Sequence, residues 1–367
     1  MFEGHRAVVI RKKDTLWSGV IEKAYDGVSI SERIAKPIDI KSVSAYVQAA
    51  RVDSHAVIRI GTTMSQPALG MLPMAALDSI SVLSHGLVDS VVVRRYSDAQ
   101  SMHVDFQSGG LDGILAFDGD RSSEGAARME SSPAPFMAAI LPRGSSGLNR
   151  ERVLSSSLVC RIDTSLARGL FDGSGIRFVS RLKGDADTGA WYAFDPERGR
   201  RMLKSSLDRS VAVRFYAPDN ELQKLAGYLA DLLARDQYRS TMVQAAEGSD
   251  LSIQFVPVNR QTPEVTIRAM LALIGSENSA LSGMAEAIGE VNDQLQIADT
   301  ASTPEPRFQS LSVAERILIE EIGCFPLFVP TIQFLCHTNI RGSMFNDDGV
   351  FDPTGLMRVK PVEGGRR

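Results

Sequence analysis

The stretch Ile10–Ile34, IRKKDTLWSGVIEKAYDGVSISERI, decides how the rest of this chain is interpreted. It begins with the charged end of a predicted strand, which a turn at Trp17-Ser18-Gly19 follows. From Ala24 to Ser31 the sequence predicts the beginning of a helix. Strands followed by helices at such short intervals are typical of an α/β protein.

The composition indicates an ordinary soluble globular protein. The chain has 367 residues, of which 44% are hydrophobic and 23% are charged, so it is long enough for two domains. The net charge of -4, with both signs well mixed, argues against nucleic-acid binding, which needs a clustered basic face. No apolar run approaches the roughly 18 residues of a membrane span. Residues 1–13 lack the apolar segment of a signal peptide.

The three cysteines, Cys160, Cys324 and Cys336, do not form a complete disulfide framework, because their number is odd. One bridge, Cys324 to Cys336, stays open at this stage. Three buried thiols that pack as small hydrophobic side chains are the favoured interpretation.

The hydrophobic pattern predicts alternating strands and helices along the chain. Strands are predicted at residues 7–11, 43–50, 55–60, 87–94, 211–216, 252–258 and 327–335. Helices are predicted at residues 97–107, 149–170, 195–204, 220–235, 263–274 and 312–322. Asp195 as N-cap with Pro196 at the first helical position is the clearest helix start. Residues 298–306 read as a polar linker.

The sequence carries no pattern that indicates catalysis. We find no G-x-S-x-G elbow, phosphate-binding P-loop, H-E-x-x-H or C-x-x-C motif. The histidines are scattered without ligand spacing, at His5, His55, His85, His103 and His337. We therefore expect neither an enzyme nor a metal site, and no cofactor.

The opening stretch resembles a signature of the bacterial extracellular solute-binding proteins of family 5, the peptide and nickel class. That signature reads F-x-L-R-x-x-x-x-W-x-[DN]-G-x-x-x-[TS]-A-x-D-V-x-x-S. The matching residues are Arg11, Trp17, Gly19, Ala24, Asp26, Val28 and Ser31. The spacing is one residue short, and the acidic residue before the glycine is missing. Because the family carries this signature well inside its mature chain, the resemblance implies a chain that is truncated or divergent at its N-terminus.

Further matches follow in the family's order. They lie at residues 42–60, 88–115, 148–173, 194–203 and 324–334. In the second segment Asp89, Asp98 and Asp112 match acidic positions of the family. Phe194–Leu203, FDPERGRRML, is similar to the family's [YF]-D-P-E-K-A-R-x-L-L. Single matches of this kind are weak, but their order over most of the chain supports the resemblance.

The resemblance implies a two-lobed, periplasmic-binding-protein-like (type II) α/β fold with mixed sheets and an interlobe cleft. Residues 1–112 plus 259–367 would form lobe one, and residues 113–258 would form lobe two. The chain would cross between the lobes near residues 110–115 and 252–259. A small solute would bind in the cleft, which closes by hinge motion.

The resemblance also places candidate ligand-binding residues on the returning strand. Peptide-binding members have W-x-A-D-Y-x-x-P there, in which the Trp packs on the ligand and the Asp pairs with the α-ammonium group. Here Val256 replaces the Trp, Asn259 replaces the Asp and Arg260 replaces the Tyr. Arg260 is also open to a simpler interpretation as a surface or hinge residue. The substitutions favour a neutral or anionic solute over a cationic one.

The implied function is that of a solute-binding protein that delivers a peptide or another small solute to the membrane subunits of an ABC importer. Such a protein would be periplasmic, or a membrane-anchored lipoprotein outside the cytoplasm. The alternative is a degenerate, non-transporting member that serves as a structural, sensory or interaction protein. Because an incomplete first lobe would expose a sheet edge, we also expect some self-association.

Overall fold

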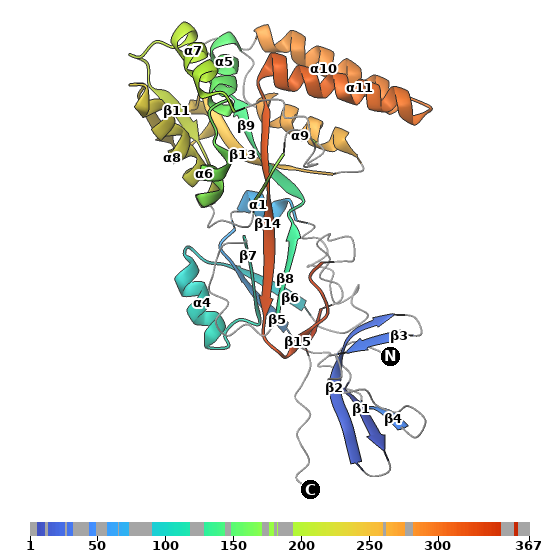
Figure 1. Ribbon diagram of the computed structural model, residues 1–367. Helices are drawn as coiled ribbons and strands as arrows, with labels where there is room; N and C mark the ends of the chain where they lie inside the picture. Colours follow the sequence, from blue (N-terminus) through green and yellow to red (C-terminus); the bar gives the residue numbers. More distant parts are fainter. Residues whose placement is uncertain are drawn as a thin grey trace.

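The computed structural model describes a mixed α/β protein whose main body has a lower and an upper half (Figure 1). The residues described are 6–11, 14–25, 28–31, 44–48, 57–64, 66–72, 90–117, 128–143, 148–170, 176–179, 182, 194–259, 262–275, 282–345 and 356–358. Parallel and antiparallel pairs both occur in the main sheet, whose order is β12-β11-β13-β9-β14-β7-β5-β6. The predicted fold class is confirmed.

The lower half of the body is built on three parallel strands. These strands are β5 (Val57–Thr62), β6 (Ser90–Arg95) and β7 (Gly113–Phe117), with β5 in the middle. Helix α1 (Gln66–Gly70) follows β5, and α4 (Ala99–Gln107) connects β6 to β7. Asp98 caps α4 by accepting a hydrogen bond from the Ser101 amide at 2.8 Å, so the helix begins where its sequence predicts.

The upper half is a sheet with helices on both faces. Its strands are β9 (Phe136–Pro142), β11 (Val213–Tyr216), β12 (Ser240–Val243) and β13 (Leu251–Pro257). One group of helices is α5 (Leu148–Val159), α6 (Thr164–Gly169), α7 (Pro196–Ser206), α8 (Asn220–Arg235) and the short η2 (Ala246–Gly248). The other is α9 (Pro263–Gly275), α10 (Ser282–Thr300), α11 (Pro304–Ile317) and the π-helical turn η3 (Leu318–Ile322).

Strand alternation divides the upper core into two apolar clusters. On β9, Phe136, Ala138 and Ile140 belong to the cluster that contains α8, and the residues between them belong to the cluster that contains α9, α10 and α11. On β13, Phe255 and Val256 separate in the same way. Because successive side chains of a strand point to opposite faces, each strand contributes to both cores. The upper half is therefore a three-layer structure.

Strand β14 (Phe325–Cys336) belongs to both halves. Its first part pairs with β9 and with β10 (Ile176–Phe178), and its second part pairs with β7 and with β8 (Arg128–Pro133). Figure 1 shows β14 running from the upper helices to the lower end of the body. A short pair, β15 (Ile340–Arg341) and β16 (Met357–Arg358), follows it.

The segment near the N-terminus forms a separate sheet in the order β3-β2-β1-β4. Its strands are β1 (Arg6–Arg11), β2 (Asp14–Tyr25), β3 (Val28–Ser31) and β4 (Ser44–Gln48). The predicted turn at Trp17 and helix from Ala24 are wrong, because β2 continues through Trp17 to Tyr25 and Val28–Ser31 is the strand β3. Trp17 lies opposite Val9 in the ladder, and Val28–Ser31 alternates apolar and polar residues with the period of a strand.

Two other sequence-based boundaries differ from the structure. The predicted helix 149–170 is two helices, because Asp163 accepts hydrogen bonds from the amides of Ser165 and Leu166 and so starts α6. The predicted linker 298–306 is mostly helical, and only residues 301–303 separate α10 from α11. Pro304 stands at the start of α11, where proline costs the helix no hydrogen bond.

Buried charged groups connect elements that are distant in sequence. The carboxylate of Asp112 accepts a hydrogen bond from the Arg59 amide at 2.9 Å and pairs with Arg358 at 2.6 Å. Asp250, 1% exposed, accepts from the amide of Arg214 at 2.8 Å. The side-chain hydrogen bond from the same arginine to Asp250 raises the pKa of the Arg214 guanidinium. Asp112, one of the acidic residues that match the family pattern at residues 88–115, therefore has a structural role.

Arg161 is a further buried charge, which joins α5 to the end of α8. Its guanidinium lies 2.7 Å from Asp236 and donates to the Leu232 carbonyl. Burial lowers the pKa of Arg161, and the nearby Asp236 carboxylate opposes that shift. The aliphatic part of the same side chain lies under Gly199 of α7, where a Cβ atom would come within 2.6 Å of it.

The division into two lobes with boundaries at residues 112/113 and 258/259 stays a prediction. In the structure Gly113 begins β7, which pairs with β5 inside the lower half, and Pro257 ends β13 inside the upper half. The chain passes between the halves at residues 133–136, where β8 gives way to β9, and again in the middle of β14. Local sequence patterns locate a strand but not its partner, and the partner defines the crossing.

All three cysteines are free and buried, which confirms the favoured interpretation of these residues. Cys324 precedes β14 and Cys336 ends it. Twelve extended residues place them about 40 Å apart, whereas a disulfide requires Cα atoms within about 7 Å. The bridge that the sequence left open is therefore not formed.

Replacing Gly199 with alanine is expected to destabilise the protein, although alanine is the better helix former. The new methyl would lie 2.6 Å from the Ser157 carbonyl oxygen of α5, a backbone atom that has little freedom to move. Overpacking of this kind costs about 1–3 kcal/mol. In Gly227→Ala on α8, where nothing lies within 4 Å of the added atom, we expect a gain of about 0.4–1 kcal/mol. Urea unfolding midpoints measure both, and changes of the same sign would contradict the packing argument.

The thiols are expected to be unreactive in the native protein. Burial raises the pKa of Cys160 and that of Cys324, so neither forms the reactive thiolate at neutral pH. A chromogenic disulfide reagent should label none of the cysteines within minutes in buffer and all three in strong guanidinium chloride. Rapid native labelling would contradict the burial. Fewer than three thiols in denaturant without a reductant would indicate a disulfide.

Candidate functional site

Three segments that are distant in sequence meet where the lower half joins the upper half. The amide of Ala134 donates to the carbonyl of Pro330 at 2.8 Å, and the amide of Val258 donates to the carbonyl of Pro135 at 2.8 Å. Ile176 of β10 lies opposite Pro330 on the other side of β14. We call this region, residues 133–136, 257–259 and 328–331, the junction. A change in the angle between the halves would have to bend these segments.

An aromatic cluster lies beside the junction. The ring centroids of Phe136 and Phe255 are 4.8 Å apart, and Phe117 lies 5.6 Å from Phe255 and 6.2 Å from Phe136. Phe136 and Phe255 are buried, while Phe117, the last residue of β7, is half-buried. The three rings connect the apolar core of the lower half with that of the upper half. Phe117 is the member that solvent or a bound molecule can reach.

The predicted ligand-binding residues lie on β13 and just after it. Val256 is 0% exposed, and its side chain belongs to the cluster that contains α9, α10 and α11. Asn259 is exposed, and its Oδ1 accepts a hydrogen bond from the Thr262 amide at 3.1 Å. Arg260 lies outside the described residues. The structure thus brings Asn259 to the edge of the junction, and the ligand-binding role of all three residues stays a prediction.

Sequence reasoning missed the aromatic cluster. On β13 the side chain that points toward the junction rings is that of Phe255, the neighbour of Val256. The alternation Ile253, Phe255, Pro257 marked that face in the sequence. Phe117 and Phe136 gave no such signal, because their proximity arises from the pairing of β9 with β13 and of β7 and β8 with β14.

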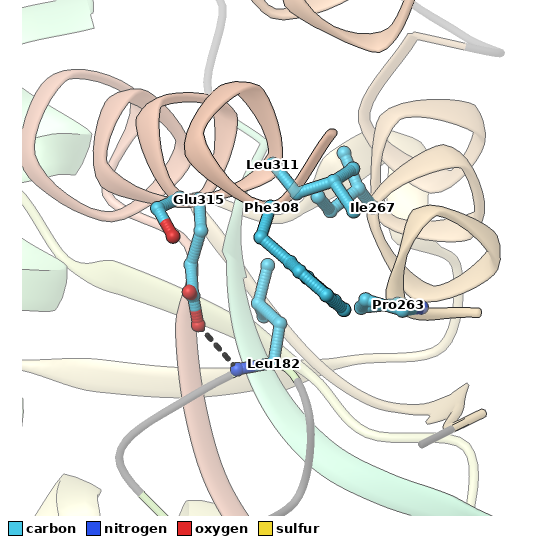
Figure 2. Close-up of a pocket in the computed structure, with 7 residues that line it drawn as sticks. Leu182, Pro263, Ile267, Phe308, Leu311 and Glu315 are labelled. Atoms are coloured by element: carbon cyan, nitrogen blue, oxygen red, sulfur yellow. Dashed lines mark hydrogen bonds between the residues drawn. The ribbon is translucent and has the colours of Figure 1, made fainter. Parts of the chain in front are cut away.

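A hollow lies in the upper half, between α9 and α11 (Figure 2). It encloses about 270 Å³, including open solvent, and its lining residues are Leu182, Pro263, Ile267, Phe308, Leu311, Ser312 and Glu315. Oε1 of Glu315 accepts a hydrogen bond from the Leu182 amide at 2.6 Å, the contact drawn as a dashed line. Phe308 is 49% exposed at its rim. This small and largely apolar hollow is separate from the junction.

Within the described ranges, no three His, Cys, Asp or Glu side chains come together as metal ligands would. The ring of His337 stacks on Phe106 with centroids 4.0 Å apart, and its Nε2 lies 3.0 Å from the Phe106 carbonyl oxygen. These contacts give this residue a structural role at the end of β14. None of the helices that the structure describes combines the length and the apolar character that a membrane crossing requires.

Comparison with protein-family models and with curated proteins finds no match. Solved structures give many matches. A dipeptide-binding protein from Pseudoalteromonas sp. SM9913, solved with Met-Leu, aligns over 74% of this chain with a TM-score of 0.61 and 12% identity. The ABC transporter substrate-binding protein CtaP from Listeria monocytogenes aligns over 74% with a TM-score of 0.58 and 11% identity. NikA from Brucella suis, solved with Fe(III)-EDTA, aligns over 74% with a TM-score of 0.58 and 14% identity.

The alignments cover 59%, 61% and 62% of those three chains, so this chain spans about three fifths of the length of the structures it resembles. At such low identity the similarity concerns the fold. It agrees with the ordered motif matches and with the confirmed mixed α/β architecture. This chain has the fold of the family 5 solute-binding proteins of ABC transporters.

Proposed function

We propose that this protein is an extracytoplasmic solute-binding protein of an ABC importer, with no enzymatic activity of its own. A peptide or another small solute would be held between the lower and upper halves and passed to the membrane subunits. The location would be the periplasm or the outer face of a membrane. The shared fold is the first support for this proposal, and the form of the junction is the second.

The observation that carries the proposal is the narrow connection between the two halves. Backbone passes between them at residues 133–136 and within β14, and these strands are hydrogen-bonded to each other through Ala134 and Pro330. A few strand residues that absorb a change of backbone angle are sufficient for hinge closure around a ligand. Phe117 and Asn259, both accessible at the junction, would face a molecule bound there.

The proposed ligand is neutral or anionic. Asn259 presents a neutral amide where peptide-binding relatives carry an acid, and Arg260 follows it with a cation. A hydrogen bond to a charged group contributes roughly 1.5–3 kcal/mol, and a neutral amide does not supply all of it to an ammonium group. Val256 faces the core, so its side chain gives the ligand no stacking surface in this conformation.

The burial of Val256 also favours a second candidate function. Where peptide-binding relatives place a Trp on the ligand, this chain places a core residue that is 0% exposed. A member that has lost ligand binding would retain the scaffold as a structural, sensory or interaction protein. The two functions differ in one measurable property, which is ligand-dependent stabilisation and closure.

A thermal-unfolding screen against short peptides, neutral solutes and small anions tests the proposal. A true ligand at about 100 times its Kd should stabilise the protein by about 2.7 kcal/mol and raise its melting temperature. The same ligand should reduce the radius of gyration in solution scattering as the halves close. If no solute in a broad panel gives stabilisation, the second candidate function is favoured.

Changing Asn259 to Asp should improve binding of peptides that carry a free amino terminus. The carboxylate keeps the acceptor for the Thr262 amide, so the turn into α9 is retained while a negative charge is added. A gain of about 1.4 kcal/mol, or roughly tenfold in Kd, is expected for free peptides. Acetylated peptides should bind with unchanged affinity.

Calorimetry with both forms of the same peptide measures this difference. Asn259→Ser is the control, because its hydroxyl accepts a hydrogen bond without adding charge. Wild-type binding that requires the free amine would contradict the proposed ligand preference. An equal gain for acetylated peptides would show that the charge does not act on the amine.

A further inference from the structure

Helix α7 presents a row of cations on its outer face. Arg198, Arg201 and Lys204 are exposed at positions i, i+3 and i+6, while Gly199 and Leu203 are buried on the opposite face. No described residue forms an ion pair with these three side chains; Arg200, which lies between them, is the one that pairs with Glu197 and Asp236. Phe194, 57% exposed, stands immediately before the helix cap Asp195. We call Phe194, Arg198, Arg201 and Lys204 the basic row.

Helix α10 presents the opposite pattern. Glu286, Glu290 and Asp293 are exposed at positions i, i+4 and i+7, and Ile297, 47% exposed, continues the same line. The helix contains no lysine or arginine, and no described residue pairs with these three acids. Asp299, outside the line, is the acid of α10 that has a partner, Arg268. We call Glu286, Glu290, Asp293 and Ile297 the acidic row.

The two rows match in length and order when the helices are antiparallel. Their charged parts extend about 9 Å and 10.5 Å, at 1.5 Å per helical residue. Antiparallel alignment sets Arg198 opposite Asp293, Arg201 opposite Glu290 and Lys204 opposite Glu286. The exposed apolar residues Phe194 and Ile297 then meet at the same end.

One molecule does not bring its own two rows together. Leu203 of α7 packs in the apolar cluster on one face of the upper sheet, while Met284, Val291 and Leu295 of α10 pack in the cluster on the other face. The α10–α11 hairpin also extends sideways from the body, away from α7 (Figure 1). The sheet lies between the two rows, so among the described residues neither row finds its complement within the same molecule, and a second molecule can supply it.

We propose that the basic row on α7 of one molecule docks on the acidic row on α10 of a second copy. Because the two surfaces differ, the contact is heterologous: the first copy keeps its acidic row free, and the second copy keeps its basic row free. Assembly can therefore continue beyond a dimer. This inference does not depend on the proposed transport function.

The association is weak and sensitive to salt. Exposed ion pairs contribute little individually and are screened within about 10 Å at 0.1 M salt. We expect self-association at high protein concentration and low ionic strength, and at least a tenfold weaker Kd at roughly 0.5 M sodium chloride.

Sedimentation velocity over a range of protein and salt concentrations tests the contact through a charge swap. Arg201→Glu and Glu290→Arg each place like charges opposite one another, so either variant alone should associate at least tenfold more weakly than wild type. In an equimolar mixture, a contact between the two different variants again sets opposite charges against one another at positions 201 and 290. The mixture should therefore recover association close to the wild-type level.

Two matched variants control for the change of net charge. Arg95→Glu, on the edge strand β6, makes the same change of net charge as Arg201→Glu at an exposed position outside both rows. Asp231→Arg, exposed on α8, does the same for Glu290→Arg. Both should associate like wild type. A wild-type protein that remains monomeric at low salt, or a mixture that fails to recover, overturns the proposal. The proposal is also overturned if the protein stays monomeric but binds vesicles that contain phosphatidylglycerol through its basic row.

Discussion

Strand β14 is the constraint on which the rest of the molecule depends. Its backbone closes the upper sheet through β9 and β10 and the lower sheet through β7 and β8. No other described strand pairs in both halves. Buried backbone amides and carbonyls must find hydrogen-bond partners. The hydrogen bonds that β14 makes to both sheets therefore hold each half in a fixed register with this one strand. Any movement between the halves would therefore be a change within a few residues near Pro330, and the two ends of the strand would move with their own sheets.

The alternation of side chains on β9 and β13 explains where a binding site can lie. On β9 alternate residues belong to the two upper cores, while on β13 Leu251, Ile253 and Phe255 pack in one core and Val256 packs in the other, so packing occupies most of these strand interiors. Accessible groups remain at the strand ends, where Phe117, Asn259 and the junction backbone lie. Groups that lie at strand ends, on connections carried by a rigid scaffold, are where binding residues are most often found. This arrangement is consistent with a common fold whose relatives were solved with ligands as different as Met-Leu and Fe(III)-EDTA.

Local chemistry in the sequence predicted much of the fold. Asp98 and Asp195 cap α4 and α7 because a carboxylate that accepts backbone amides acts within a few residues. The leucine spacing of α8 gave its bounds, since one apolar stripe faces one core. Non-local facts were not accessible in this way. The pairing of β9 with β13, the pairing of β7 with β14 and the meeting of Phe117 with Phe255 depend on segments more than a hundred residues apart. The alternation in Val28–Ser31 has the period of a strand, but four residues are too few to distinguish a strand from the first turn of a helix.

The position of β14 in the chain has a consequence for synthesis. Its partners β7, β8 and β9 are complete by residue 142, whereas β14 begins at residue 325. Closing so long a loop is slow, and contacts of high sequence separation are the last to form. Until β14 has left the ribosome, β7 and β9 have no strand between them and these edges are unprotected. The nascent protein therefore keeps an open sheet until β14 is made, and a chain whose elongation stops before β14 exposes strand edges that promote aggregation.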